Sequence, residues 1–361
     1  MNIQKWSFFL VVLICISCTN DEENTVAIPV PEAFYFPPNG SDVWETKSIS
    51  DLNWNVAAVD DLKNFLNSSN TQAFMVLVNG RIVIEEYFNS ATSTTLIPWF
   101  SASKTLTSFT VGLAQQDGFI TINDLSSDYL GSGWTNMPVN KESLITIKHQ
   151  LTMSSGGDYT TGDTNCTDPI CLNYLADAGT EWYYYNAFYT MIQPALDGAI
   201  SGGFSNYFNT NLKNVIGMTG LWYQTPNYNK YYVGNARSMA RFGLLNLNKG
   251  TWNGNELLNE AYFNEMTTTS QDLNKSYGYL YWLNGKESYR APGSTQLYPG
   301  KLIPNAPDDL FAGLGANDKK MYIIPSLNMV VIRLGGAAGT SLLGPSGYDN
   351  LLWEKINAVI N

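Results

Sequence analysis

Two side chains near residue 100 are spaced for nucleophilic chemistry. Ser101 and Lys104 stand three positions apart in the run Phe100-Ser101-Ala102-Ser103-Lys104, at the start of a helical pattern. Residues at this spacing share one face of a helix, so the serine hydroxyl is expected to lie beside the lysine amine. His149 is the only histidine in the chain, and one imidazole cannot serve several candidate nucleophiles. If Ser101 is a nucleophile, we therefore expect its base to be a group other than imidazole.

The residues after Ser101 predict the helix that would carry it. Apolar residues recur at helical spacing, and Asp117-Gly118 then form a typical helix stop. A serine at a helix start has free backbone N–H groups nearby, which can help to hold an oxyanion. The alternative is an N-cap serine followed by an exposed lysine, because a lone S-x-x-K occurs by chance on the order of once in a chain of this size. The tetrapeptide by itself is weak evidence.

Strand patterns occur near both ends of the chain. Two predicted hairpins have apolar runs on either side of a short turn, at residues 73–88 and 321–334. Helical apolar spacing occurs at residues 59–66 and 348–360, and the middle of the chain is helical and rich in loops. We therefore predict the α/β (α+β) class, with an antiparallel sheet built from both termini, flanked by helices, and an inserted, mainly helical lobe.

Composition and charge exclude several classes of protein. The 361 residues are 44% hydrophobic and 13% aromatic, which is typical of a globular chain and not of a disordered one. The net charge is −11, and no cluster of Lys and Arg offers a surface for phosphates. We therefore expect no nucleic acid partner.

The first residues indicate export. Residues 7–16 are apolar but too few to span a bilayer, and Ser17-Cys18 follows, which resembles a bacterial lipoprotein cleavage site. The acidic residues 19–24 resemble a surface-export signal of some Gram-negative lipoproteins. We predict a signal peptide at 1–17, a tether at 18–55 lipidated at Cys18, and a folded domain at 56–361. The protein would then be an outer-membrane or cell-surface lipoprotein, or otherwise periplasmic, and would touch a membrane only through its lipid anchor. The alternative is an ordinary cleaved signal peptide with Cys18 incidental.

Export also decides how the remaining cysteines are interpreted. Cys166 and Cys171 lie in a short loop that contains proline, and in an oxidising compartment such a pair favours a local disulfide. Zinc binding is the weaker alternative, because no second cysteine pair or histidine cluster completes a ligand shell. We predict no metal and no cofactor.

The surroundings of Ser101 resemble those of a known family. The run from Trp99 to Thr105 is similar to a segment of the serine beta-lactamase-related superfamily. The resemblance continues in five later stretches: Gly112, Gln116 to Gly118, Ile122 to Asp124, Asp128 to Leu130 and Ile145 to Gly157. The match lies with class C beta-lactamases, DD-peptidases, related esterases and 6-aminohexanoate-dimer hydrolases, and covers about residues 60–355. The resemblance implies a beta-lactamase/transpeptidase-like fold. It also places His149 inside a helix, so we expect His149 to be structural.

A second motif of the family lies at residues 179–187. This stretch resembles the Y-x-N motif, which implies Tyr184 as the catalytic tyrosine and Asn186 as its partner, orienting Lys104 or a substrate amide. Either Tyr184, as a phenolate favoured by a nearby ammonium, or a neutral Lys104 can take the proton of Ser101. The neighbouring aromatic residues are expected to pack in the core: Trp182, Tyr183 and Tyr185.

The third motif departs from the family pattern. Residues 312–321 contain neither K-T-G nor H-x-G, whose side chains bind the substrate carboxylate in beta-lactamases and DD-peptidases. Gly315 and Ala316 fall where 6-aminohexanoate-dimer hydrolase-like members have a glycine followed by an apolar residue. A backbone N–H of Ala316 can still stabilise an oxyanion, because that task needs no side chain. Lys319 or Lys301 would have to replace the lost charge, although each has the pattern of a solvated surface lysine.

Two further stretches are similar to the esterase branch. Residues 235–243 resemble its helix, and residues 277–282 resemble its pocket-lining strand. Tyr281 and Trp282 are candidates for an acyl or aromatic subsite only if that strand faces the cleft, and core packing is the alternative.

These observations predict an exported serine hydrolase that acts on a small-molecule ester or amide. Ser101 would form an acyl-enzyme, with Lys104 and Tyr184 as proton shuttle and the N–H groups of Ser101 and Ala316 as oxyanion donors. Two alternatives remain from the sequence. One is a DD-peptidase or beta-lactamase, and the other is a catalytically weak surface binding protein.

Overall fold

A computed structural model describes residues 32–160, 162–339 and 344–361. The chain divides into two units, Met1–Ala33 and Phe34–Asn361, and the predicted signal peptide and Cys18 lie outside the described residues. Residues 34–54 belong to the second unit, because aromatic side chains such as Phe36, Trp44 and Trp54 pack against its core. Within the described ranges, no helix is both long and apolar enough to cross a membrane.

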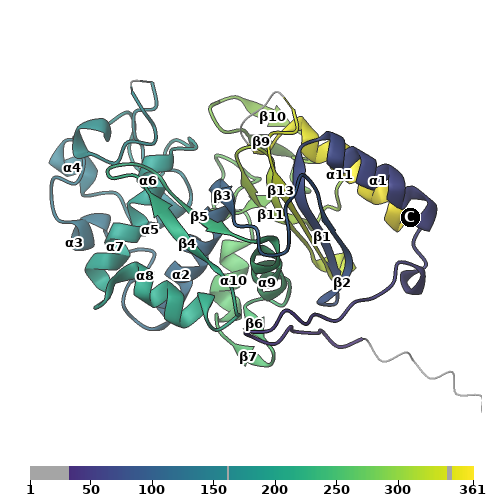
Figure 1. The fold of residues 1–361 in the computed structure, drawn as a ribbon. Coiled ribbons are helices and arrows are strands. Elements are labelled where there is room, and N and C mark those ends of the chain that lie inside the picture. The colour runs from purple at the N-terminus through teal and green to yellow at the C-terminus, as the bar shows by residue number, and fades with distance from the viewer. Residues whose placement is uncertain (1–31, 161, 340–343) are drawn as a thin grey trace, which may run out of the picture. The chain divides into compact units, whose positions relative to one another are not determined.

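A six-stranded antiparallel sheet built from both ends of the second unit confirms the predicted fold class (Figure 1). Its strands, in spatial order, are β2 (Arg81–Tyr87), β1 (Thr71–Val78), β13 (Met329–Gly335), β12 (Lys319–Ile324), β11 (Phe311–Gly315) and β8 (Trp282–Leu283). The first hairpin turns at Asn79-Gly80, where both residues have positive φ, as the tightest hairpin turns require. The central strands β12 and β13 are buried along their whole length.

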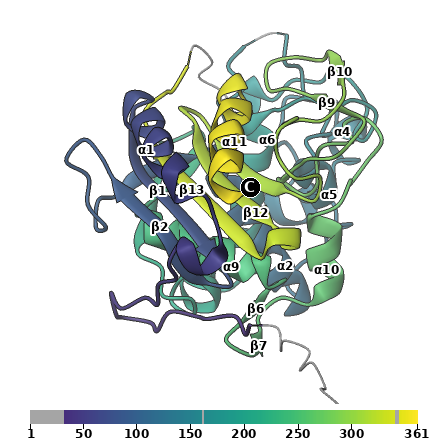
Figure 2. The ribbon, with the colours of Figure 1, turned by 90° about the vertical axis from the view of Figure 1, so that its right-hand side faces the viewer.

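Helices cover both faces of the sheet. The helix α1 (Val59–Ser68) packs beside α11 (Gly347–Ile360) on one face, and α9 (Ala236–Leu247) packs on the opposite face, as Figures 1 and 2 show from two directions. The helix α2 (Lys104–Gln116) is buried from Lys104 to Ala114. It ends as predicted, with Gly118 at a φ of 78°.

The inserted lobe is mainly helical. Its helices are α3 (Ser126–Leu130), α4 (Val139–Glu142), α5 (Ile147–Leu151), α6 (Asn186–Thr190), α7 (Ile192–Ala199) and α8 (Gly203–Phe208), and α10 (Glu260–Met266) follows α9. The short helical turns are η1 (Ser50–Leu52), η2 (Val56–Ala58), η3 (Ser101–Ser103), η4 (Pro169–Cys171), η5 (Asn209–Lys213) and η6 (Pro325–Leu327).

Small sheets that the sequence did not predict complete the second unit. A three-stranded sheet has the order β3 (Ile97–Phe100), β5 (Lys230–Gly234) and β4 (Gly220–Gln224). Two hairpins pair β6 (Thr251–Trp252) with β7 (Asn255–Glu256), and β9 (Ser288–Arg290) with β10 (Leu297–Pro299). The strand β3 leads directly into η3 and α2, so the three-stranded sheet fixes where α2 begins.

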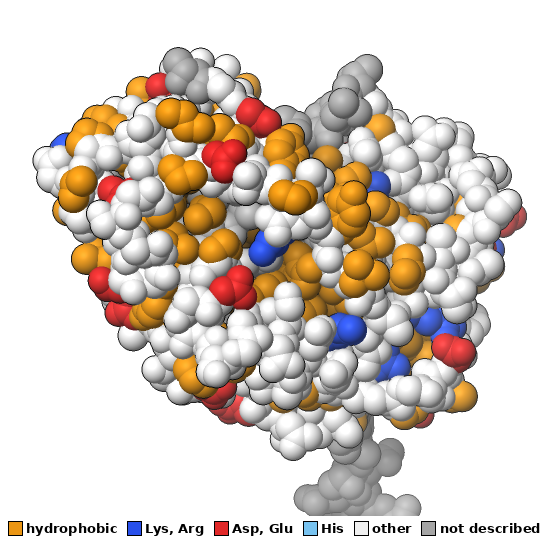
Figure 3. All heavy atoms as spheres, turned by 60° about the vertical axis from the view of Figure 1, so that its left-hand side comes forward, with side chains coloured by type: hydrophobic (Ala, Val, Ile, Leu, Met, Phe, Trp, Pro, Cys, Tyr) orange, Lys and Arg blue, Asp and Glu red, His pale blue; other side chains and the backbone are white. Residues whose placement is uncertain are grey.

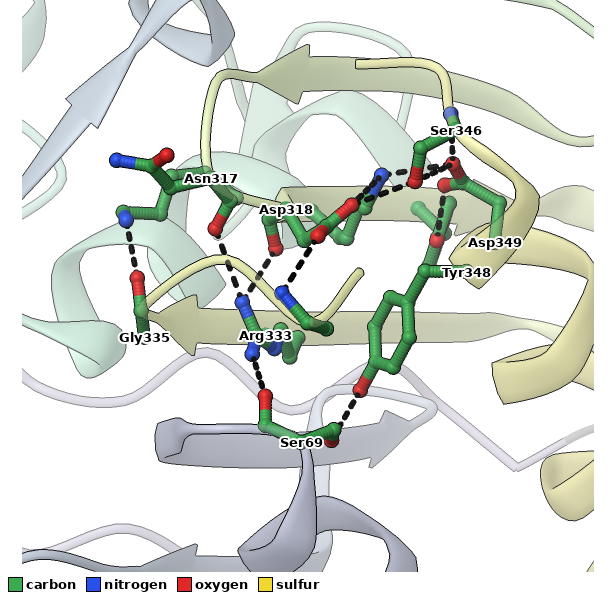
Figure 4. A network of polar contacts seen from close by, with 12 residues as sticks. Ser69, Asn317, Asp318, Arg333, Gly335, Ser346, Tyr348 and Asp349 are labelled. Atoms are coloured by element: carbon green, nitrogen blue, oxygen red, sulfur yellow. Dashed lines mark hydrogen bonds and ion pairs between the residues drawn. The ribbon is translucent and has the colours of Figure 1, made fainter. Parts of the chain in front are cut away.

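A buried arginine supports the turn between β11 and β12. Asn317 and Asp318 both have positive φ, 56° and 58°, a conformation that residues other than glycine adopt only at a cost. Arg333 Nη1 donates to the carbonyl oxygens of Asn317 at 3.1 Å and Asp318 at 2.9 Å (Figure 4). Arg333 Nη2 donates to the Ser69 carbonyl oxygen at 2.6 Å, which ties the turn to the end of α1.

A buried ion-pair network continues from the same turn (Figure 4). Lys320 lies fully buried, with Nζ 3.2 Å from Asp318 Oδ1 and 2.7 Å from Asp349 Oδ2. Asp318 also accepts hydrogen bonds from Ser346 Oγ at 2.6 Å and Ala338 N at 2.9 Å. Burial alone would raise the pKa of Asp318, but Lys320 and these two donors together hold it below its ordinary value. The network therefore connects the β11–β12 turn with the chain at Ala338 and Ser346.

Removing the lysine from this network is expected to destabilise the fold strongly. In Lys320→Met, Asp318 and Asp349 lose their counter-charge in a buried site, and the free energy of unfolding should fall by about 3–5 kcal/mol. Urea unfolding followed by circular dichroism measures this. Lys249→Met is the matched control, because the pair of Lys249 and Glu260 is exposed and should change stability little. Equal, small effects of the two substitutions would contradict the structural role of the network.

Candidate active site

A cavity of about 300 Å³ opens beside Ser101. Four residues that the sequence predicted for the site line it together: Ser101, Tyr184, Asn186 and Ala316. The remaining described residues of the lining are also uncharged, and they include Asn165 and Asn229. The structure thus brings the predicted residues to one place, although they come from three separate segments of the chain.

The turn before Ser101 is strained and firmly held. Phe100, the last residue of β3, has a φ of 47° and a ψ of −131°, a region that side-chain-bearing residues rarely occupy. The hydroxyl of Ser103 donates to the Phe100 carbonyl oxygen and accepts from the backbone N–H of Tyr232 at 3.0 Å. Ser103 therefore fixes both the turn and the adjacent strand β5, and with them the position of Ser101 at the start of η3.

Lys104 lies beneath Ser101 in an aromatic environment. Its Nζ is 2.7 Å from Ser101 Oγ, and the side chain is only 1% exposed. The Nζ also lies 4.8 Å from the ring centroid of Tyr184 and 4.2 Å from that of Tyr189. Burial lowers the pKa of Lys104 well below its ordinary value, because the charged ammonium is poorly solvated there. A neutral amine at this distance can accept the proton of the serine hydroxyl.

Tyr184 reaches the same hydroxyl from the segment just before α6. Its side chain forms a hydrogen bond with Ser101, and Trp282 stacks on its ring at a centroid distance of 5.8 Å. Burial raises the pKa of Tyr184, and the bond with Ser101 offsets only part of that rise. The phenol is therefore protonated near neutral pH, which suits it to donate and relay a proton.

Asn186, the first residue of α6, binds a side chain that the sequence did not predict, and its role in orienting a substrate amide stays a prediction. Its Nδ2 donates to Asn165 Oδ1 at 2.6 Å, and its Oδ1 is buried without a hydrogen-bond partner. Among the described residues, no hydrogen bond joins Asn186 to Lys104. Asn165 is a cavity residue that the sequence did not identify. In the sequence, the only feature that draws attention to Asn165 is its position next to Cys166.

Gly315 allows the end of β11 to approach the nucleophile turn. A Cβ atom at Gly315 would lie 2.3 Å from the Trp99 carbonyl oxygen and 3.0 Å from the Ala102 nitrogen, so a larger residue could not fit without displacing backbone. The approach brings Ala316 to the cavity that Ser101 lines. A backbone oxyanion donor has to lie at this cavity, and the oxyanion role of the Ala316 N–H stays a prediction.

The lysines considered as substitutes for the K-T-G lysine lie elsewhere. The expectation that Lys319 is a solvated surface residue is wrong: it is buried, its Nζ donates to the Gly335 carbonyl oxygen, and it lies 5.1 Å from the ring centroid of Phe100. Burial lowers its pKa to about 8. Lys301 is exposed, as expected for a surface lysine, and pairs with Asp308. Neither side chain is part of the described lining of the cavity.

The conditional subsite at Tyr281 and Trp282 is not present. Both side chains are buried, and neither belongs to the described lining of the cavity. The Tyr281 hydroxyl donates to Asn246 Oδ1 at 2.6 Å, while Trp282 supports the ring of Tyr184. The alternative of core packing holds for both residues.

Three other residues that the sequence singled out have structural positions. Cys166 and Cys171 are joined by a disulfide bond in the loop that also carries Asn165. His149 caps α5 as a structural residue: its Nδ1 accepts from the backbone N–H of Thr146 at 3.1 Å, and its own N–H donates to Thr146 Oγ1 at 3.2 Å. In the described part of the chain, no group of three or more His, Cys, Asp and Glu side chains is arranged to hold a metal ion.

Solved structures with the same architecture have low sequence identity to this chain. A Bacillus anthracis protein provisionally named 6-aminohexanoate-dimer hydrolase is 19% identical, with a TM-score of 0.63 over 82% of this chain and 80% of its own. A penicillin-binding protein homologue from Caulobacter crescentus is 14% identical, with a TM-score of 0.62 over 84% and 96%. A family VIII carboxylesterase is 16% identical, with a TM-score of 0.60 over 83% and 96%. These structural similarities show that the chain has the same fold as these proteins.

Sequence comparisons identify the family. A curated relative of unassigned function from Alkalihalophilus pseudofirmus is 23% identical over 305 residues, which are 76% of this chain and 85% of the relative. The family model described as Beta-lactamase matches residues 68–334. This span holds the Ser101 turn, the Tyr184 segment and the β11–β12 turn. The chain therefore belongs to the Beta-lactamase family and is a serine hydrolase of that family.

Proposed function

We propose that the protein hydrolyses small esters, and related amides, through an acyl-enzyme formed at Ser101. The observation that carries this proposal is the buried amine of Lys104, 2.7 Å from Ser101 Oγ. A serine hydroxyl is a weak nucleophile unless a neighbouring group removes its proton. Since burial lowers the pKa of Lys104 and raises that of Tyr184, Lys104 is the better base and Tyr184 the better proton donor.

The proposed reaction proceeds in two steps. In the first, Lys104 Nζ takes the proton of Ser101 while Oγ attacks the ester carbon, and Tyr184 passes a proton to the departing alcohol as its C–O bond breaks. The N–H groups of Ser101 and Ala316 hold the oxyanion. Lys104 then returns its extra proton to the Tyr184 phenolate, which restores the neutral amine and the phenol. In the second step, water gives a proton to Lys104 and attacks the acyl carbon. The bond to Oγ then breaks, and the proton returns to Ser101.

The uncharged cavity supports a neutral substrate. The K-T-G motif is absent, and Lys319 and Lys301 are engaged away from the described lining. Without a cation, a substrate carboxylate would lose its hydration and gain no counter-charge. The carboxylesterase among the similar structures favours the same class of substrate. Since a penicillin-binding homologue is also similar, a DD-peptidase or beta-lactamase is the second candidate. A weak binding protein is the third.

Export is part of the proposal. The disulfide between Cys166 and Cys171 supports it, because disulfides persist mainly in oxidising compartments. Lipidation at Cys18, with an outer-membrane or cell-surface position, stays a prediction, since Cys18 lies outside the described residues.

Trapping the covalent intermediate tests the reaction class. After mixing with 4-nitrophenyl acetate, intact-protein mass spectrometry should show one acetyl group on the wild type and none on Ser101→Ala. A penicillin should leave the mass unchanged, because the described lining of the cavity holds no cation to pair with its carboxylate. A long-lived, Ser101-dependent penicillin adduct would instead support the peptidase or lactamase candidate. Absence of any adduct or turnover with either compound would support the binding protein.

The pH dependence of the rate tests the role of Lys104. Only the neutral amine accepts a proton, so kcat/KM should rise with pH through an apparent pKa well below the ordinary lysine value of about 10.4. Lys104→Met should lower kcat/KM by about 10²–10⁴-fold and remove this limb. Lys319→Met is the control, because Lys319 is a second buried lysine with a pKa of about 8. If the rise of kcat/KM with pH disappears in Lys319→Met and persists in Lys104→Met, Lys104 is not the base.

A further inference from the structure

The three-stranded sheet that ends at the nucleophile has an apolar outer face. Strand residues alternate between the two faces of a sheet, and directly paired residues of neighbouring antiparallel strands share a face. Pairing aligns Pro98 with Val233 and Val233 with Leu221, and it aligns Tyr231 with Tyr223. The residues between them point inward. Tyr232, for example, is fully buried against Trp99 and Trp222.

Part of this outer face is open to solvent. Leu221 is 55% exposed and Tyr223 is 49% exposed, while Phe100, Tyr231 and Val233 are partly buried. None of the outward positions on the three strands carries a charge. Figure 3 shows hydrophobic side chains gathered across the middle of one face of the molecule, with few charged side chains among them. Exposed apolar surface of this kind marks a binding site more often than isolated apolar residues do.

The face is continuous with the catalytic cavity. Phe100 precedes Ser101 and lines the cavity beside it. The ring of Phe100 contacts that of Tyr231 at a centroid distance of 5.2 Å, and Tyr231 contacts Tyr223 at 5.3 Å. Asn229, just before β5, also lines the cavity. We call the surface formed by Phe100, Tyr231, Tyr223 and Leu221 the aromatic strip.

We propose that the aromatic strip binds an alkyl or aryl chain of the ester whose carbonyl reacts at Ser101. The preferred substrates are then uncharged esters with a chain longer than acetyl, on either the acyl or the alcohol side. The strip begins at the cavity wall and runs outward, so a chain attached to the reacting carbonyl can lie on it without leaving the site. This inference rests on the proposed function, because it extends the same site.

Chain-length series measure the binding of such a chain. Full burial of one methylene group corresponds to about a fourfold gain in kcat/KM. A chain that lies on an open strip buries only part of each methylene, so kcat/KM should rise about twofold for each methylene added. We therefore expect kcat/KM to rise from 4-nitrophenyl acetate through butyrate to octanoate. A parallel series of alkyl acetates of increasing chain length tests the alcohol side.

A double variant assigns the gain to the strip. Leu221→Ser/Tyr223→Ser should reduce kcat/KM for the long esters of at least one series about tenfold. The rate with methyl acetate, which carries neither a long chain nor a ring, should stay unchanged. The matched control is Leu144→Ser/Leu351→Ser, which replaces two leucines of similar exposure, 48% and 51%, outside the strip. The control should retain the wild-type dependence on chain length.

Several outcomes would overturn the inference. Wild-type chain-length dependence in the double variant would do so, as would a wild type without any such dependence. If the double variant instead converts an oligomer to a monomer in sedimentation and keeps the chain-length dependence, the strip is a contact between copies of the chain. If the wild type hydrolyses none of the esters, the proposed function itself is wrong, and this inference is wrong with it.

Discussion

The burial of the Lys104 amine against the hydroxyl of Ser101 is the constraint on which the rest of the site depends. An amine in water would be charged and would have no capacity to accept a proton, but desolvation disfavours the charged form. Rings of Tyr184 and Tyr189 surround Nζ, and the described cavity lining offers no charge of either sign. In the proposed mechanism the site therefore obtains its base from burial, and the single histidine of the chain, His149, caps α5.

Such a lysine requires a helix start that is buried and yet opens onto a cavity. The architecture meets both needs by placing the start of α2 between the β11 end of the large sheet and the three-stranded sheet. Three close fits hold it there. They are the strained turn at Phe100, the contact that only glycine allows at position 315, and the support of the β11–β12 turn by Arg333. The buried pair of Lys320 and Asp318 adds rigidity to the same turn.

Features with local sequence signals could be predicted, and features made by long-range contacts could not. The large sheet followed from two hairpins with short turns, and the end of α2 followed from Gly118. The three-stranded sheet was missed because β3 has four residues and pairs with a strand more than 130 positions later. The burial of Lys319 was also missed, because its long side chain lies under Phe100 and its partner is a backbone oxygen. Of the cavity residues, Asn165 depends on the fold of the disulfide loop and has no motif.

Titration of the lysine side chains by NMR tests the state of Lys104 most directly. In protein labelled with ¹³C and ¹⁵N at lysine, one signal is expected to titrate well below the ordinary value of about 10.4 and to be absent from Lys104→Met. Lys319→Met identifies the separate signal of Lys319, whose pKa is about 8. If the signal lost in Lys104→Met titrates at the ordinary value, Lys104 is charged near neutral pH and is not the base that activates Ser101.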